Sequence, residues 1–263
     1  MKESTVIEFN NLSIGYKDKS ETVTIASGIS ASLCQGSLVS VAGPNGGGKS
    51  TLLRTLAGYL PPLSGNIFIN GADVTRISIG LRATSVAVVL TRQPTLNSTS
   101  AFDMVSLGRT PYTGFFGNLT NSDKAIIQKA MEITQTWHLK DREINTLSDG
   151  ERQKIMIAKA IAQDTPIIIL DEPTAFLDYP SKVSVMQLLR KMCENLEKTI
   201  ILSTHDLEIA FALTSQLWLI DKSKGFVAGT VGELGEKAEI ARFFNSPVLH
   251  YDYMSRNFII DNN

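Results

Sequence analysis

Residues 43 to 50 read Gly-Pro-Asn-Gly-Gly-Gly-Lys-Ser, a complete match to the phosphate-binding loop pattern G-x-x-x-x-G-K-[S/T]. The apolar run Leu38 to Ala42 precedes this loop, and a helix-like segment from Ser50 to Leu56 follows it. A strand, a glycine-rich loop and a helix in this order are the context that the motif requires. The pattern therefore predicts an α/β fold that binds a nucleoside triphosphate at this point of the chain.

The residue types of the loop explain the prediction. Glycines let the backbone curl, so that successive N–H groups and the N-terminus of the helix converge on phosphate oxygens. Lys49 is expected to reach the β- and γ-phosphates, and the Ser50 hydroxyl is a ligand suited to Mg²⁺, which takes few protein oxygens. The predicted nucleotide-binding residues here are Gly43, Pro44, Asn45, Gly46, Gly47, Gly48, Lys49, Ser50 and Thr51.

Composition excludes several other classes of protein. The chain has 263 residues and a net charge of -1, and it has no basic run, which argues against nucleic acid as a partner. The N-terminus has no apolar signal segment, and apolar runs such as Ile167 to Leu170 are far too short to span a membrane. Cys34 and Cys193 are too few for a disulfide framework and are expected to be buried thiols. We expect a soluble or peripheral cytoplasmic protein.

Hydrophobic patterning divides the chain into three regions of one domain, residues 1–263. An antiparallel edge sheet is predicted from Val6 to about Leu33, and a strand at residues 65–69 is followed by an Asn-Gly hairpin turn. Strands at 86–90, 167–170, 200–203 and 217–220, with helices at 181–196 and 207–213, indicate a parallel sheet. Residues 1–93 and 164–263 are expected to form the nucleotide-binding core. About residues 94–163 are expected to form a helical subdomain, in which Ser122 caps a helix that runs through Thr136.

Two carboxylates follow a buried strand. Asp171 and Glu172 come directly after Ile167 to Leu170, which places them at the carboxyl edge of a sheet, where ligands of such folds bind. Asp171 is predicted to hold Mg²⁺. Glu172 is predicted to polarise the water that attacks the γ-phosphate.

The segment Leu147-Ser148-Asp149-Gly150-Glu151, shortly upstream of these carboxylates, resembles the L-S-G-G-[Q/E] signature of ABC-type ATPases. The other motifs of that family follow in order along nearly the whole chain. Tyr16 stands at the A-loop position, Ala175-Phe176-Leu177-Asp178 resembles the D-loop, and His205 stands at the switch histidine.

The resemblance implies roles for these residues. Tyr16 would stack on adenine, and His205 would contact the γ-phosphate in its own subunit. Ser148 and Gly150 would contact the γ-phosphate held by the opposite subunit, and Asp178 would belong to the same nucleotide site. The family therefore implies a homodimer with composite sites for ATP and Mg²⁺.

Three positions depart from the family pattern. Gly47 replaces a usual serine, which removes a hydroxyl but leaves the backbone N–H groups. Asp149 replaces the first glycine of the signature, and its charge is expected to slow hydrolysis or to alter dimer closure. The glutamine that normally follows the strand at 86–90 is missing in register, where Thr91 stands, so Gln93 is the candidate metal contact from this loop.

The segment from Val105 to Tyr112, Val-Ser-Leu-Gly-Arg-Thr-Pro-Tyr, resembles the V-x-x-G-R-x-P-Y pattern of ATPases that serve importers of iron-siderophores, haem and cobalamin. This resemblance implies an energy-coupling subunit at the cytoplasmic face of the inner membrane, bound to two permease subunits and supplied indirectly by a substrate-binding protein. The aromatic residues here would form a permease groove or pack in the core, and Arg109 would contribute to that surface or be solvated. The alternatives are an ATPase of a cytosolic complex, such as iron-sulfur cluster assembly, and an ATP-sensing dimer without turnover. The apolar stretch 240–260 is expected to pack on the core or on the partner.

Overall fold

The computed structural model describes residues 4–18, 21–91, 98–114 and 116–260. Its centre is a six-stranded sheet in the order β10 (Gly225–Gly229), β9 (Gln216–Asp221), β3 (Leu38–Ala42), β8 (Thr199–Ser203), β7 (Ile167–Leu170) and β6 (Val86–Val89). β10 is antiparallel to β9, and the other neighbours are parallel. Every residue of β3, β7 and β8 is buried, as expected for parallel strands covered on both faces. The predicted parallel sheet is confirmed.

A second sheet is antiparallel and has the order β2 (Thr22–Cys34), β1 (Thr5–Lys17), β4 (Ser64–Ile69) and β5 (Ala72–Asp73). It confirms the predicted edge sheet and the Asn70-Gly71 hairpin, although β1 and β2 span 13 residues each rather than short pieces. Bulges between Phe9 and Gly15 keep the two strands paired while the chain bends. This sheet brings Tyr16 toward the phosphate-binding loop.

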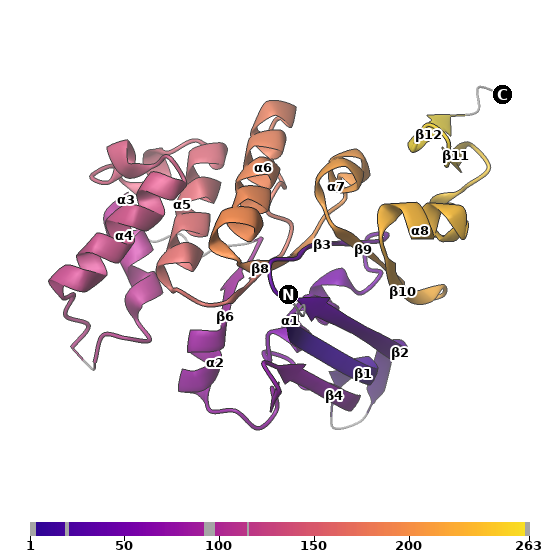
Figure 1. The fold of residues 1–263 in the computed structure, drawn as a ribbon, viewed down its shortest axis with the longest axis horizontal. Helices are drawn as coiled ribbons and strands as arrows, with labels where there is room; N and C mark the ends of the chain where they lie inside the picture. The colour runs from indigo at the N-terminus through magenta and orange to yellow at the C-terminus, as the bar shows by residue number, and fades with distance from the viewer. Residues whose placement is uncertain (1–3, 19–20, 92–97, 115, 261–263) are drawn as a thin grey trace.

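The helices lie in two groups (Figure 1). Around the sheets are α1 (Lys49–Leu56), α2 (Ile79–Ser85), α6 (Tyr179–Leu196), α7 (Leu207–Leu213), α8 (Val231–Glu236) and α9 (Glu239–Phe244). Between β6 and β7 in the chain are α3 (Ala101–Ser106), α4 (Asn121–Ile133) and α5 (Asp149–Ala162), with short 3-10 turns at Leu107–Arg109, Trp137–Leu139 and Ile144–Thr146. Figure 1 shows α3, α4 and α5 packed together beyond α6, at one end of the molecule. Their treatment as a separate subdomain stays a prediction. Within the described residues, we find no helix with the length and apolar character needed to cross a membrane.

The predicted start of α4 was wrong by two residues. Thr120, not Ser122, is the N-cap: its hydroxyl accepts from the Asp123 N–H at 3.1 Å, and Asp123 Oδ2 accepts from the Thr120 N–H at 3.0 Å. This reciprocal capping box needs a carboxylate three residues after the cap, and Ser122 has Ala125 there. The helix ends at Ile133 rather than Thr136, since Gln135 adopts a left-handed φ of 59°.

The C-terminal part packs on the core, as one of the two alternatives predicted. Ile240, Phe243 and Tyr251 are buried against Leu217 and Leu219 of β9. The hairpin of β11 (Leu249–Asp252) and β12 (Asn257–Ile260) joins this cluster through Phe258, whose ring lies 5.4 Å from that of Tyr251. Cys193 is buried, but Cys34 is only half-buried, so the expectation of two buried thiols is wrong for Cys34.

Three helices begin with capping boxes whose carboxylates titrate abnormally. Hydrogen bonds from Thr120, Ser148 and Thr230 lower the pKa of Asp123 from 3.8 to about 2, and lower those of Glu151 and Glu233 from 4.5. A depressed folded-state pKa gives stability that is present above the unfolded value and is lost as the pH falls through the folded one. We expect the urea midpoint to fall as the pH drops from about 5 to about 2, through the folded-state pKa of Asp123. Glu233→Gln should lower the midpoint at neutral pH and flatten this loss. If the urea midpoint of Glu233→Gln fell with pH as steeply as that of the native chain, the capping carboxylate of Glu233 would not contribute to the acid-induced loss of stability.

Candidate active site

The phosphate-binding loop joins β3 to α1, as its sequence context predicted. Gly43 and Gly48 have φ values of 156° and 114°, and Gly48 is in the region that favours glycine. A Cβ at Gly43 would lie 2.0 Å from the Ile220 carbonyl oxygen, and one at Gly48 would lie 2.6 Å from Ile25. The backbone of β9 at Ile220 and the Ile25 side chain of β2 therefore pack directly against the loop, and a side chain at Gly43 or Gly48 would displace them.

Lys49 lies under the loop. Its side chain is buried, and Nζ donates to the carbonyl oxygens of Gly43 at 2.9 Å and Pro44 at 3.1 Å, with His205 Nδ1 at 3.5 Å. Burial lowers the pKa of Lys49, and the nearby carboxylates of Glu172 and Asp171 oppose that shift. The ammonium group is thus held at the entrance to α1 by contacts that phosphate oxygens can replace.

Asp171 connects the loop to the ends of β7 and β8. Its Oδ1 accepts hydrogen bonds from the hydroxyls of Ser50 at 2.9 Å and Ser203 at 2.7 Å, and Ser203 Oγ accepts from the Glu172 N–H at 2.8 Å. The β7 and β8 strands end side by side, which is why residues far apart in sequence meet here. Ser203 was not among the predicted site residues; its position at the end of a buried strand next to Thr204 and His205 was the available signal.

Glu172 and His205 face each other beside this cluster. His205 Nε2 lies 2.6 Å from Glu172 Oε1, and both side chains are partly exposed. Glu172 has a φ of 52°, a left-handed conformation that is costly for a residue with a side chain and that concentrates at functional sites. The Glu172 side chain turns toward His205, while Asp171 faces Ser50 and Ser203. The neighbouring carboxylates therefore point to different partners. Asp171 suits a metal ligand beside Ser50, and Glu172 suits a base that acts on water beside His205.

A cavity of ≈ 270 Å³ opens above the loop. Its lining includes Tyr16, Ile25, Asn45, Gly46, Gly48, Lys49, Ser50, Thr51, Glu172 and Lys222. The Tyr16 hydroxyl lies 3.1 Å from Thr51 Oγ1 and its ring is 45% exposed, so one face is available for stacking. Sequence reasoning missed Ile25 and Lys222, which come from β2 and from the β9–β10 turn, because neither belongs to a linear motif.

A second group of polar residues lies on the segments that follow Glu172 and His205. Asp178 in this group was a predicted site residue, whereas Thr174 and Lys182 were not. Asp206 accepts from Thr174 Oγ1 at 2.8 Å and forms an ion pair with Lys182 at 2.7 Å. Asp178 is the N-cap of α6, where its carboxylate accepts from the Ser181 N–H at 3.1 Å. These bonds link the segment after Glu172 to the segment that carries His205.

The family is decided by comparison with known proteins. The family described as ABC transporter matches residues 26–175, more than half of the chain. The chain belongs to the ABC transporter family. It is 35% identical over 258 residues to an uncharacterized ABC transporter ATP-binding protein of Methanocaldococcus jannaschii, covering 98% of this chain and 88% of that protein.

Two further matches agree with this assignment. The iron(3+)-hydroxamate import ATP-binding protein FhuC of Bacillus subtilis is 32% identical, covering 85% of this chain and 81% of that protein. A solved structure of a putative metal-chelate type ABC transporter in an inward-facing conformation aligns with a TM-score of 0.80 at 26% identity, covering 97% of this chain and 95% of that one. The protein is an ABC transporter ATPase that binds ATP.

In this ABC transporter ATPase the signature segment lies apart from the nucleotide cavity. Ser148 is the N-cap of α5, and its hydroxyl is 2.8 Å from Glu151 Oε2 in a capping box. Neither Ser148 nor Gly150 is among the described residues that line the ATP cavity. A built Cβ on Gly150 would lie 3.4 Å from Ser181 Oγ of α6, which brings the start of α5 close to the D-loop helix. The structure therefore does not place Ser148 and Gly150 in the lining of the cavity that Lys49 and Ser50 line in the same chain.

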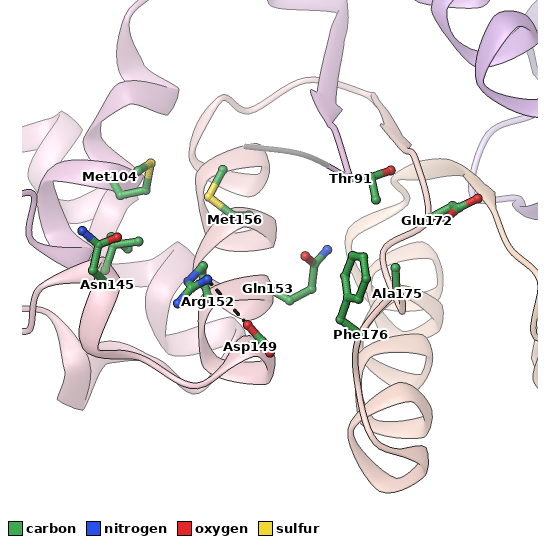
Figure 2. A pocket seen from close by; sticks show the side chains of 11 residues that line it. Thr91, Met104, Asn145, Asp149, Arg152, Gln153, Met156, Glu172, Ala175 and Phe176 are labelled. Atoms are coloured by element: carbon green, nitrogen blue, oxygen red, sulfur yellow. Dashed lines mark ion pairs between the residues drawn. The ribbon is translucent and has the colours of Figure 1, made fainter. Parts of the chain in front are cut away.

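Figure 2 shows the surroundings of two of the positions that depart from the family pattern, Asp149 and Thr91. Asp149 lines a pocket together with Arg152 and pairs with it at 3.5 Å, which partly neutralises its charge. A Cβ at Gly47 would lie 3.0 Å from the carbonyl oxygens of Ile220 and Pro44, so glycine fits the close contact with the end of β9. Thr91 Oγ1 donates to the Asp171 carbonyl at 2.7 Å and lines the same pocket as Glu172. Gln93, the predicted alternative metal contact, lies outside the described residues.

Proposed function

We propose that this ABC transporter ATPase is the energy-coupling subunit of an importer for metal chelates of the iron-siderophore, haem or cobalamin type. The convergence of Lys49, Ser50, Asp171, Glu172 and His205 around one cavity supports ATP hydrolysis. The likeness to a hydroxamate import ATPase and to a metal-chelate type transporter supports the substrate class. The exposed side chains of Leu107, Tyr112 and Phe116 support a permease-facing surface; Phe115 lies outside the described residues.

The donor set fits a Mg²⁺ ion bound with the nucleotide. The Ser50 hydroxyl and the Asp171 carboxylate already share a hydrogen bond of 2.9 Å, and two protein oxygens leave positions for phosphate oxygens and water. When bound, Mg²⁺ supplies charge neutralisation at the β- and γ-phosphates. Lys49 adds a second positive charge, Glu172 accepts the proton of the attacking water, and His205 orients Glu172 and contacts the γ-phosphate. Tyr16 stacks on adenine.

The complete site is composite. Ser148 and Gly150 of a second copy, with Asp178 near the contact, would close over the γ-phosphate, so that ATP binding closes the homodimer and hydrolysis reopens it. This chain would lie at the cytoplasmic face of the membrane, where closing and reopening of the homodimer would change the conformation of the permease bound to it. The small molecule itself never touches this chain.

Affinity capture tests the transport assignment. A tagged Glu172→Gln chain, purified from membranes of its native cells in ATP, is expected to bring down a multi-span permease, identified by mass spectrometry. Tagged Lys49→Ala chain is the matched control that should not hold the closed state. Recovery of soluble partners alone would move the protein to a cytosolic ATPase complex. Recovery of the dimer alone, without turnover in the native protein, would indicate an ATP sensor.

Lys222 is a further proposed nucleotide contact. It enters the cavity from the turn directly after β9. The backbone of β9 at Ile220 packs against Gly43, and a cation beside this loop attracts phosphate. We expect Lys222→Ala to raise the KM for ATP by about threefold to tenfold with little change in kcat, since ground state and transition state lose the same contact. Lys237→Ala, at an exposed lysine directly after α8, is the control. Steady-state kinetics with an unchanged KM would remove Lys222 from the site.

A further inference from the structure

The last carbonyl groups of α5 are capped by the Gly-Arg-x-Pro-Tyr segment. The final four carbonyls of a helix lack partners within it. In α5, Lys159 O and Ile161 O accept from the N–H groups of the next turn, Ala162 O accepts from Arg109 Nη1 at 2.9 Å, and Gln163 O accepts from the Tyr112 hydroxyl at 3.0 Å. Two of these four bonds, those to Ala162 O and Gln163 O, therefore come from one distant segment.

Arg109 is built into this contact rather than solvated. Its side chain is buried, forms an ion pair with Asp123 at 2.9 Å, and stacks on the Tyr112 ring with 4.0 Å from the guanidinium carbon to the ring centre. The Arg109 contact and the Thr120 cap hold the Asp123 carboxylate in its charged form, so a buried cation has a permanent partner. The expectation of a solvated Arg109 is thus wrong.

Gly108 explains why the segment approaches so closely. A Cβ built on Gly108 would lie 2.3 Å from the Lys159 carbonyl oxygen and 3.1 Å from the Gln163 backbone nitrogen. Only glycine lets the 3-10 turn Leu107–Arg109 press against the backbone of α5. Gly108, Arg109 and Tyr112 consequently all contact the C-terminal end of α5.

Gln163 connects this helix end to the central sheet. Its Nε2 donates to Ala83 O at 2.7 Å and to Val86 O at 3.2 Å. Ala83 lies in α2, and Val86 begins β6, which pairs with β7, the strand directly before Asp171. A single amide side chain thus ties the end of α5 to the sheet that carries the candidate catalytic carboxylates.

We infer that Gly108, Arg109, Tyr112 and Gln163 form an internal joint that anchors the far end of α5 to the edge of the sheet and so positions Ser148 at its other end. The helix has 14 residues, about 21 Å at 1.5 Å per residue. A small change of angle at the joint therefore moves Ser148 by several times the displacement at Gln163. The inference rests on the proposed composite site. In it, these four residues act by positioning Ser148 and do not touch the nucleotide themselves.

The test separates positioning from ATP binding. In the Glu172→Gln background, we expect Gln163→Ala to weaken ATP-dependent dimerisation by about tenfold, measured by analytical ultracentrifugation, while the nucleotide affinity of the monomer changes less than about twofold. In the otherwise native chain, kcat should fall by about tenfold with KM nearly unchanged. Tyr112→Phe, which removes only the hydroxyl and keeps the stacked ring, should give a smaller loss of about threefold.

Two further variants make the outcome decisive. Gln163→Glu keeps the side-chain length but removes both donated bonds, so it should match Gln163→Ala. Gln128→Ala removes an exposed glutamine that bonds only to Glu132 on α4 and should behave as the native protein. Unchanged dimerisation and kcat in Gln163→Ala would overturn the joint, as would a parallel loss of monomer ATP affinity, which indicates a merely structural role. If Glu172→Gln itself fails to dimerise in ATP, the composite site is wrong, and the role of the joint falls with it.

Discussion

Replacement of Glu172 by glutamine is expected to stop turnover while ATP binding persists. Glutamine keeps the size of the side chain and an oxygen that His205 Nε2, now 2.6 Å from Glu172 Oε1, can reach. It has no basic carboxylate to accept a proton from water, and loss of a general base typically costs a hundredfold or more in rate. Phosphate release should therefore fall by at least about 100-fold, and nucleotide affinity should change little, since Lys49 and the loop are intact.

A control variant and a second site variant test the assignment of Glu172 as the general base. Glu194→Gln changes an exposed glutamate that pairs with Arg190 and should leave turnover at the native rate. His205→Ala removes the group that faces Glu172 and should also lower kcat. Native turnover in Glu172→Gln would disprove the assignment of the base and move it to another group of the cavity.

Replacement of Trp218 by alanine is expected to have the largest effect on folding. Trp218 is fully buried in β9 and packs edge-on against Phe9 of β1 at 5.3 Å and Phe226 of β10 at 5.9 Å. It therefore joins the two sheets. A tryptophan-to-alanine change in a core costs about 3–5 kcal/mol, which urea unfolding followed by circular dichroism will show as a large drop in midpoint.

Trp218→Phe gives a contrasting result. The indole Nε1 of Trp218 is buried without a hydrogen-bond partner in the described part of the chain, so phenylalanine removes an unsatisfied donor while keeping most of the packing. We expect a loss of less than about 1.5 kcal/mol. Trp137→Ala, at a partly exposed tryptophan beside Lys140, should also be milder than Trp218→Ala. Equal losses in all three variants would disprove the packing argument.

The sequence predicted the architecture well because its signals are local. The run Leu38 to Ala42 is apolar except for Ser40 and was predicted as the strand before the loop; the structure has a strand with the same bounds, and all of its residues are buried. The Asn70-Gly71 turn likewise needs only its own backbone preferences. Helix boundaries were predicted less well at α4, where Thr120 and Ser122, two positions apart, compete as caps and the bonds with Asp123 decide between them.

The contacts of other residues carried no local signal. Lys222 lines the ATP cavity through the position of a turn on β9, and Ser203 meets Asp171 through the pairing of β7 with β8. Arg109 is a charged residue in a motif, and nothing in its neighbours along the chain shows that Asp123 and the end of α5 will enclose it. These contacts depend on which elements lie side by side.

The sequence by itself determined the α/β core, the phosphate-binding loop and the family motifs, because each needs a particular residue type at a fixed spacing along the backbone. The tertiary structure decided which side chains meet. It placed Glu172 against His205, assigned the Gly-Arg-x-Pro-Tyr segment to the end of α5, and joined that end to β6 through Gln163. Hydrogen bonds and ion pairs act over about 3 Å, so a residue 50 or more positions away becomes a partner only when packing of the apolar core brings the two elements into contact.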